Sequence, residues 1–182
     1  MFVDVELAVD EPDIDHCGKC TKCIDACPTE AIIESRQVDS NKCIAYHTIE
    51  NRGLIDPGLS SKFGTWMAGC DVCQRVCPWN EPAQGKSIDE TIHFERDNSA
   101  FGVSFAELLQ WDLKKFKVET KDIAMNRMKY HGFLRNLGIA TFNSKLPVEQ
   151  KKAVLEKIRE HSQQIENKEY RNIVLETLES LS

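Results

Sequence analysis

Residues 16–33 read HCGKCTKCIDACPTEAII, and four cysteines fall within eleven positions of this stretch. Two residues lie between the first and second cysteines, and two more lie between the second and third. Three residues precede the fourth cysteine, which is followed directly by proline. A second group starts at Cys43 and ends in GCDVCQRVCPW (69–79), which supplies Cys70, Cys73 and Cys77. All eight cysteines of the chain belong to these two groups, and both groups end in x₃-C-P.

This repeated ending is typical of bacterial two-cluster ferredoxins, in which the fourth cysteine of each run ligates the other cluster. Thiolates at intervals of three reach different irons of one cubane, and the wider step directs the fourth thiolate toward the second cubane. Proline then fixes φ, removes a backbone donor and turns the chain away. The pattern predicts two ligand sets: Cys17, Cys20, Cys23 and Cys77 for one [4Fe-4S] cluster, and Cys27, Cys43, Cys70 and Cys73 for the other.

Zinc and disulfides are the alternatives for so many cysteines. Two Cys₄ zinc sites would also use C-x₂-C pairs, but zinc does not need a third cysteine at the same interval. The N-terminus, MFVDVELAVDEPDID, is acidic and lacks the basic flank and apolar stretch of a signal peptide. Because thiols stay reduced in the cytosol, disulfides are disfavoured. No apolar run approaches the roughly 20 residues of a membrane span, and a cytoplasmic location is predicted.

Charge divides the 182 residues into two parts. Residues 1–100 carry 9 basic and 18 acidic side chains, whereas residues 101–182 carry 14 and 11. The cysteines all lie in the acidic part. We therefore predict two domains, a two-cluster ferredoxin-like domain over 1–99 and an α-helical domain over 100–182.

A long insert separates the first cysteine of the second group from the rest. A simple ferredoxin has two residues at this point, but here IAYHTIENRGLIDPGLSSKFGTWMAG (44–69) intervenes. Turns are expected at Arg52-Gly53 and at residues 56–58. Such an insert must loop out from the clusters, and the residues alone leave open whether it covers something or forms a surface lid.

Helical patterns dominate the second part, so the predicted fold class is mainly α, with the ferredoxin-like module followed by a small HEAT-like α-helical module. A family-specific helical cap fits equally well. One helix is expected to start at Ser104, with Glu107 completing a capping box. Residues 121–130 and 132–142 predict two helices divided by Gly132, with Ile139 and Phe142 buried. Two more helices are expected over 146–164 and 169–181.

A basic stretch lies inside the helical part. From residue 111 to residue 145 there are eight basic and three acidic side chains. Such runs are often solvated helix faces. Polar and aromatic residues that can meet phosphate or stack on bases are interleaved with them: Asn126, Tyr130, His131, Asn136 and Asn143.

Four segments together resemble a known family: CGKCTKCIDACPTEAI (17–32), CIAYHTIENRG (43–53), GCDVCQRVCPWN (69–80) and GFLRNLGIATFNS (132–144). They are similar to the C-terminal part of epoxyqueuosine reductases, cobalamin-dependent iron–sulfur oxidoreductases of queuosine biosynthesis. The resemblance implies that the two clusters pass electrons to cobalamin, which removes the epoxide oxygen of epoxyqueuosine in the anticodon loop of tRNA. It also implies that Ala45, Gly69 and Asp71 face the corrin ring. The tRNA contacts expected from the basic stretch and the resemblance together are Arg127, Lys129, Arg135 and Asn136.

The chain departs from this family in two respects. Family members carry an N-terminal domain that supplies most of the cobalamin pocket and the proton-donating acid, so no catalytic residue is assigned here. FVDVELAV (2–9) alternates like one strand of that domain. Ala45 replaces the serine usual in the family. The implied partners are that domain or its gene product, an upstream electron donor and tRNA, with no membrane. The rival functions are a stand-alone two-cluster electron carrier and the electron-transfer tail of a reductive dehalogenase.

Overall fold

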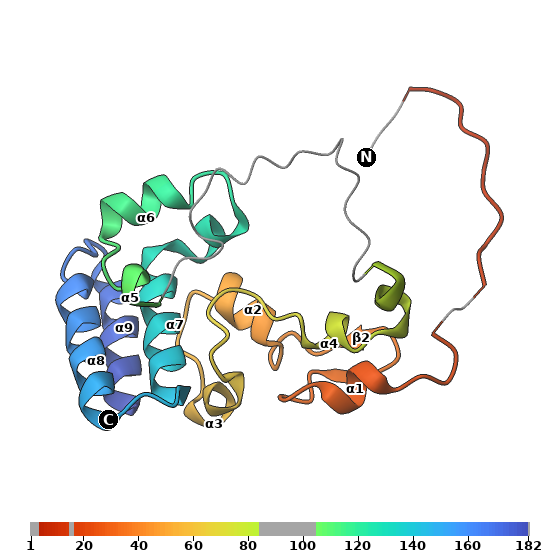
Figure 1. Cartoon of the computed structure of the whole chain (residues 1–182). Helices are drawn as coiled ribbons and strands as arrows, with labels where there is room; N and C mark the ends of the chain where they lie inside the picture. Colours follow the sequence, from red (N-terminus) through yellow and green to blue (C-terminus); the bar gives the residue numbers. More distant parts are fainter. Residues whose placement is uncertain (1–3, 15–16, 84–104, 182) are drawn as a thin grey trace.

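The computed structural model describes residues 4–14, 17–83 and 105–181. Short elements that carry the cysteines lie on one side, a bundle of longer helices lies on the other, and the insert lies between them (Figure 1). In chain order the elements are α1 (Lys22–Ala26), β1 (Ile32–Glu34), β2 (Gln37–Val38), α2 (Ile44–Ile49), α3 (Pro57–Ser60), η1 (Ser61–Phe63), α4 (Val72–Arg75), η2 (Pro78–Ala83), α5 (Phe105–Leu108), α6 (Leu113–Glu119), η3 (Ala124–Met128), α7 (Lys129–Asn143), α8 (Val148–Ser162) and α9 (Lys168–Ser180).

The cysteine-bearing region has little core of its own. Helices α1 and α4 bury no residue, although they pack against each other. Strands β1 and β2 form one antiparallel hairpin in which Ile32 pairs with Val38. Between residues 17 and 42 only Thr29 and Ala31 are buried. So few apolar contacts leave this region dependent on bound metal for its stability.

The principal core surrounds α7. This helix packs against both α8 and α9, and its central residue Phe133 is completely buried. Aromatic rings continue the core toward α6, because Phe133 stacks on Trp111 and also contacts Phe116. On α8 the most deeply buried apolar residue is Ile158, which is 1% exposed. The helical part therefore owes its stability to packing on α7 rather than to intrinsic helix propensity.

The insert packs against α7. Ile44, Ile55 and Phe63 of the insert share a buried cluster with Ile139 of α7 and Leu181 after α9. Asp56 caps α3 by accepting a hydrogen bond from the Leu59 N–H at 3.0 Å, so the turn expected at 56–58 begins a short helix. The insert is therefore a structural bridge to the helical part rather than a loose surface lid.

Several expectations about local structure are corrected. Helix α7 runs through Gly132 without a break, because Gly132 lies buried in its first turn, where a Cβ would meet Met128 at 3.4 Å. Phe142, expected to be buried, is 42% exposed at the end of α7, where the Lys151 ammonium lies over its ring. The start expected at Ser104 and the boundary expected at residues 99–100 lie outside the described residues.

The N-terminal segment and the helical array also differ from expectation. Residues 4–14 form no strand, and Val5, Leu7 and Val9 are exposed, because no other segment of the described chain pairs with them. Helices α7, α8 and α9 pack on one another, but a HEAT-like repeat is not confirmed. Among the described helices, none has the length and apolar character needed to cross a bilayer.

Candidate iron–sulfur centre

The cysteines sit at the ends of short helices. Cys27 ends α1, Cys43 precedes α2 and Cys73 lies within α4. All eight are free thiols; Cys17 and Cys20 are exposed and the other six are partly buried. Such positions leave the sulfur atoms accessible while the helix ends fix the direction of the chain. Over residues 4–14, 17–83 and 105–181, no three His, Cys, Asp or Glu side chains are grouped to hold a single metal ion.

The thiols predicted to share the second cluster lie near one another. Burial raises the pKa of the Cys70 thiol, while a hydrogen bond from the Val72 N–H opposes this rise. Negative charge on three other thiols raises the same pKa further; they are Cys73, Cys43 and Cys27. These are the remaining members of the second predicted set. The assignment of these four thiols to one cluster stays a prediction from the spacing.

Cys27 is prepared for the thiolate form. Burial raises its pKa, but hydrogen bonds from Ala31, Thr29 and Ile32 outweigh burial, so the pKa is lowered overall. The Ala31 N–H donates to Cys27 Sγ at 3.3 Å, and Thr29 Oγ1 lies 3.6 Å from the same sulfur. Because metals bind the thiolate, this environment suits a ligand. Hydrogen bonds to cluster sulfurs also adjust the reduction potential.

The first predicted set is arranged by the packing of α1 on α4. Cys23 lies in α1, and Cys77 lies two residues after the end of α4. Their packing brings the two stretches together. At the start of the first cysteine run, the Cys20 N–H donates to Cys17 O at 3.0 Å and closes a tight turn. The donors available in both sets are thiols alone, which is the ligand chemistry of a [4Fe-4S] cluster.

A buried arginine joins the helical part to the insert. Arg135 of α7 is 0% exposed, and its guanidinium donates to three backbone carbonyls: His47 O at 2.6 Å, Gly53 O at 2.5 Å and Asn51 O at 3.0 Å. Its neighbour Asn136 donates to Thr48 O at 2.7 Å and to Met67 O at 2.9 Å. Burial and the Arg52 charge lower the pKa of Arg135 to about 10, so it remains a cation at neutral pH. The insert is thus held by charge-assisted hydrogen bonds.

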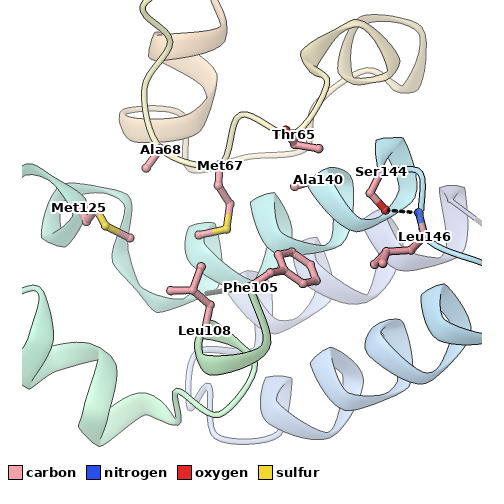
Figure 2. Close-up of a pocket in the computed structure, with 9 residues that line it drawn as sticks. All are labelled: Thr65, Met67, Ala68, Phe105, Leu108, Met125, Ala140, Ser144 and Leu146. Atoms are coloured by element: carbon pink, nitrogen blue, oxygen red, sulfur yellow. Dashed lines mark hydrogen bonds between the residues drawn. The ribbon is translucent and has the colours of Figure 1, made fainter. Parts of the chain in front are cut away.

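An apolar cavity of about 560 Å³ lies where the insert meets α5 and α7. Met67 points from the insert toward Phe105 and Leu108 of α5, and Ala140 lines the cavity from α7 (Figure 2). Met67 and Ala68 directly precede Gly69 and Cys70 along the chain. The loop that delivers Cys70 is therefore positioned by apolar contacts with the helical part.

Comparison with known proteins agrees with this arrangement. Residues 16–80 match the family model described as a 4Fe-4S double cluster binding domain, which favours iron–sulfur clusters over zinc. An epoxyqueuosine reductase of Aliivibrio fischeri is 41% identical over 144 residues, which cover 79% of this chain and 38% of that protein. One from Synechocystis is 57% identical over 82 residues, covering 44% and 28%.

The chain is homologous to epoxyqueuosine reductases over most of its length. It spans about 40% of the length of the curated relatives it matches. The solved epoxyqueuosine reductase of Bacillus subtilis superposes with a TM-score of 0.68 at 23% identity, covering 97% of this chain and 45% of that one. Another, solved with an epoxyqueuosine-modified tRNA-Tyr stem loop, gives 0.64 at 24% identity, covering 94% and 52%. At these identities the likeness establishes the fold.

The resemblance to epoxyqueuosine reductases pointed to Ala45, Gly69 and Asp71 as cobalamin contacts, and the structure brings the first two together. Thr48 Oγ1 accepts from the Gly69 N–H at 3.0 Å and lies 3.4 Å from Ala45 O. Gly69 has a φ of +78°, which favours glycine, and a Cβ there would meet only Ile49, at 4.0 Å. Ala45 and Gly69 are small residues next to the segments that carry Cys43 and Cys70, whereas Asp71 is an exposed residue at the start of α4.

The tRNA contacts expected from the epoxyqueuosine reductase resemblance need correction. Arg135 and Asn136 are buried and bound to backbone carbonyls, so neither side chain is available to phosphate. Lys129 is exposed, and Arg127 is exposed in an ion pair with Glu50 at 2.6 Å. Exposed ion pairs are weak, and phosphate can replace the carboxylate. Of the proposed contacts, Arg127 and Lys129 remain.

Sequence reasoning missed two polar residues of the insert. Thr48 is 1% exposed and links Gly69 to α2, and His47 bonds Asn41 O through Nε2 at 2.7 Å. Asn143 was grouped with possible phosphate contacts, but its amide donates to Ser60 O at 2.8 Å and Gly64 O at 3.1 Å. The sequence offered one signal that these side chains are buried. Arg135, Asn136 and Asn143 all lie on the helix with the most apolar surroundings.

Proposed function

We propose that the chain is the electron-transfer and tRNA-binding part of an epoxyqueuosine reductase, which reduces epoxyqueuosine to queuosine in tRNA. The observation that carries the proposal is the double-cluster cysteine pattern, in a chain that is 41% identical to a curated member over 144 residues. The cluster ligands would be the two sets predicted from the spacing. The gathering of Cys27, Cys43 and Cys73 around Cys70 supports this assignment.

The two clusters fit the electron count of this reaction. Converting an epoxide to an alkene consumes two electrons and two protons and releases the oxygen as water. Each cubane changes by one electron, so a pair of clusters holds the electrons for one turnover. Cobalamin, when bound, would supply a cobalt centre able to attack the epoxide carbon. This chain would contribute Ala45 and Gly69 to its edge, and the small size of both residues would let the cofactor approach the second cluster.

The exposed basic residues support tRNA binding. Of the eight basic side chains between residues 111 and 145, seven are exposed: Lys114, Lys115, Lys117, Lys121, Arg127, Lys129 and Lys145. They stand on an otherwise acidic protein of net charge -6. A related fold has been solved with a tRNA stem loop. Contacts to the phosphate backbone position such a substrate without reading its sequence.

Salt dependence tests the tRNA role. With clusters reconstituted, we expect the full chain to bind an anticodon stem-loop RNA about tenfold more weakly in 200 mM than in 50 mM salt, because phosphate contacts release counterions. Fluorescence anisotropy measures both affinities. The double variant Lys121→Ala/Arg127→Ala should bind more weakly than Lys152→Ala/Lys168→Ala, which removes the same charge elsewhere. Absence of salt-sensitive RNA binding would favour the stand-alone electron carrier.

Turnover by this polypeptide alone is a separate question. We expect no queuosine when the chain is mixed with epoxyqueuosine-tRNA, cobalamin and a reductant, because no described residue is assigned the proton-donor role. Nucleoside analysis of the digested tRNA by mass spectrometry measures the product, with a full-length relative as positive control. Formation of queuosine by this chain would contradict the expectation.

A further inference from the structure

A cavity of about 480 Å³ opens where α7 begins, away from the cysteines. It is lined by residues of α6, η3, the first turn of α7, the segment between α8 and α9 and the first turn of α9, and by Arg52 of the insert. Its charged and aromatic lining includes Arg52, Lys117, Lys129, His131, Glu166 and Tyr170. We call it the α7 pocket. Its volume falls in the range typical of small-molecule sites.

His131 lines this pocket with an unused hydrogen-bonding atom. The residue is 3% exposed, and its Nε2 has no hydrogen-bond partner. Its ring stacks on Tyr170 with centroids 4.0 Å apart and planes at 10°. The backbone of Arg52 accepts a hydrogen bond from the ring, which must come from Nδ1 because Nε2 is unpaired. Buried polar atoms without partners are rare in folded proteins, and each one needs an explanation.

The protonation state of His131 defines what Nε2 can bind. Burial lowers its pKa to about 4, and the nearby positive charges of Arg135 and Arg52 lower it in the same direction. The ring is therefore neutral at pH 7. With the proton on Nδ1, Nε2 carries a lone pair and can only accept a hydrogen bond. Its missing partner must be an O–H or N–H group.

The surroundings of the α7 pocket favour an anion as well. Arg52, Lys117 and Lys129 bring three positive charges against the single carboxylate of Glu166. The pocket also contains the first three residues of α7, a 15-residue helix whose start has no side-chain cap. The Lys129 N–H already donates to Asn126 O, but the positive end of the helix dipole attracts anionic groups such as phosphate.

A ribonucleotide combines both requirements. We propose that the α7 pocket holds one nucleotide of a bound RNA, with its phosphate at Lys129 and the start of α7 and its ribose 2′-hydroxyl donating to His131 Nε2. This proposal deepens the proposed function and rests on it for the identity of the RNA. The 2′-hydroxyl distinguishes RNA from DNA at a binding site. The α7 pocket would therefore discriminate between the two polymers.

The test compares RNA and DNA hairpins of one sequence on the full, cluster-loaded chain at pH 7.5. His131→Phe keeps an aromatic ring against Tyr170 but removes the acceptor. It should weaken RNA binding about fivefold, as loss of one hydrogen bond predicts, and leave DNA binding unchanged. Lys129→Ala should weaken both polymers and reduce the salt slope by about one. Lys152→Ala, an exposed lysine on α8, is the charge-matched control and should stay within twofold of the wild type.

A conservative variant separates recognition from folding. His131→Gln retains an acceptor and should recover the preference for RNA, with thermal unfolding by circular dichroism confirming that each variant folds. If His131→Gln loses the RNA preference as fully as His131→Phe, the side chain acts structurally and the proposal is overturned. RNA affinity unchanged in both His131→Phe and Lys129→Ala would overturn it as well.

Mononucleotides distinguish failure of the α7 pocket from failure of the proposed function. Calorimetric titration with adenosine monophosphate and its 2′-deoxy form measures the α7 pocket directly. Preference for the ribose form, lost in His131→Phe, would support the α7 pocket even if the RNA hairpin does not bind, and the hairpin result would then count against the tRNA role. Equal or absent binding of both mononucleotides, with normal hairpin binding, would overturn the α7 pocket and leave the tRNA role standing.

Discussion

Replacing Arg135 by methionine is expected to lower the thermal unfolding midpoint of the helical part by about 10 °C. The variant leaves three backbone carbonyls of the insert without their donor, those of His47, Asn51 and Gly53. Breaking such a buried, charge-assisted network costs about 3–5 kcal/mol. For a chain of this length each kcal/mol corresponds to roughly 2–4 °C.

The guanidinium geometry explains why methionine and lysine both fail here. Arg135 uses Nε and both terminal nitrogens, since Asn136 Oδ1 accepts at 3.1 Å and 3.0 Å besides the three carbonyls. A lysine ammonium has three donors at one point and cannot reach carbonyls on separate sides. Arg135→Lys should therefore lose most of the same stability. The insert would also be held less firmly on α7, because only the amides of Asn136 and Asn143 and the apolar cluster around Ile139 would remain among the contacts described above.

Circular dichroism at 222 nm under anaerobic conditions follows this transition. Arg159→Met is the matched control, since its side chain is partly exposed on α8 and pairs only with nearby Glu156 at 3.1 Å. We expect the control to shift the midpoint by less than about 2 °C, as surface substitutions do. An Arg135→Met midpoint equal to that of the control would show that the insert is held mainly by its apolar cluster.

Arg135 also shows where sequence reasoning reached its limit. In the sequence it is one of several basic residues in a positive stretch, and charge counting treats all of them as surface. Leu134, one position before it, and Leu137, two positions after it, are 2% and 1% exposed, and Arg135 itself is 0% exposed, so this part of the helix is interior. The partners that make burial possible are backbone carbonyls more than 80 positions away in the chain, which no local pattern reveals.

The cysteine pattern was informative because its chemistry is local. Three intervals of fixed length and a following proline specify how a chain wraps a cubane, and they predicted a double-cluster domain that the family match confirms. Helix positions were also predictable where the apolar period was strong, as in α8 and α9. Gly132 misled because a glycine can lie inside a well-packed helix, and α7 continues through it. The role of the insert depended on contacts with Ile139 and Leu181, which only the folded chain brings near.

The exchange of ligands between the two cysteine runs gives the second large expected effect. The double variant Cys27→Ala/Cys43→Ala should keep one cluster, about four irons per chain instead of about eight, because both residues are assigned to the same cubane. Cys27→Ala/Cys17→Ala should lose both clusters, since each substitution removes a ligand from a different cubane. Iron and acid-labile sulfide analysis after anaerobic reconstitution measures the difference. Alanine is chosen because serine can itself ligate iron.

The two double variants control for each other. Each removes two cysteines and shares the loss of Cys27, so a difference in iron content cannot come from the number of thiols removed. If each run instead enclosed its own cluster, the result would reverse, and Cys27→Ala/Cys17→Ala would be the variant that retains iron. The reciprocal pair gives a second reading, because Cys77→Ala/Cys17→Ala should retain one cluster and Cys77→Ala/Cys73→Ala should retain none.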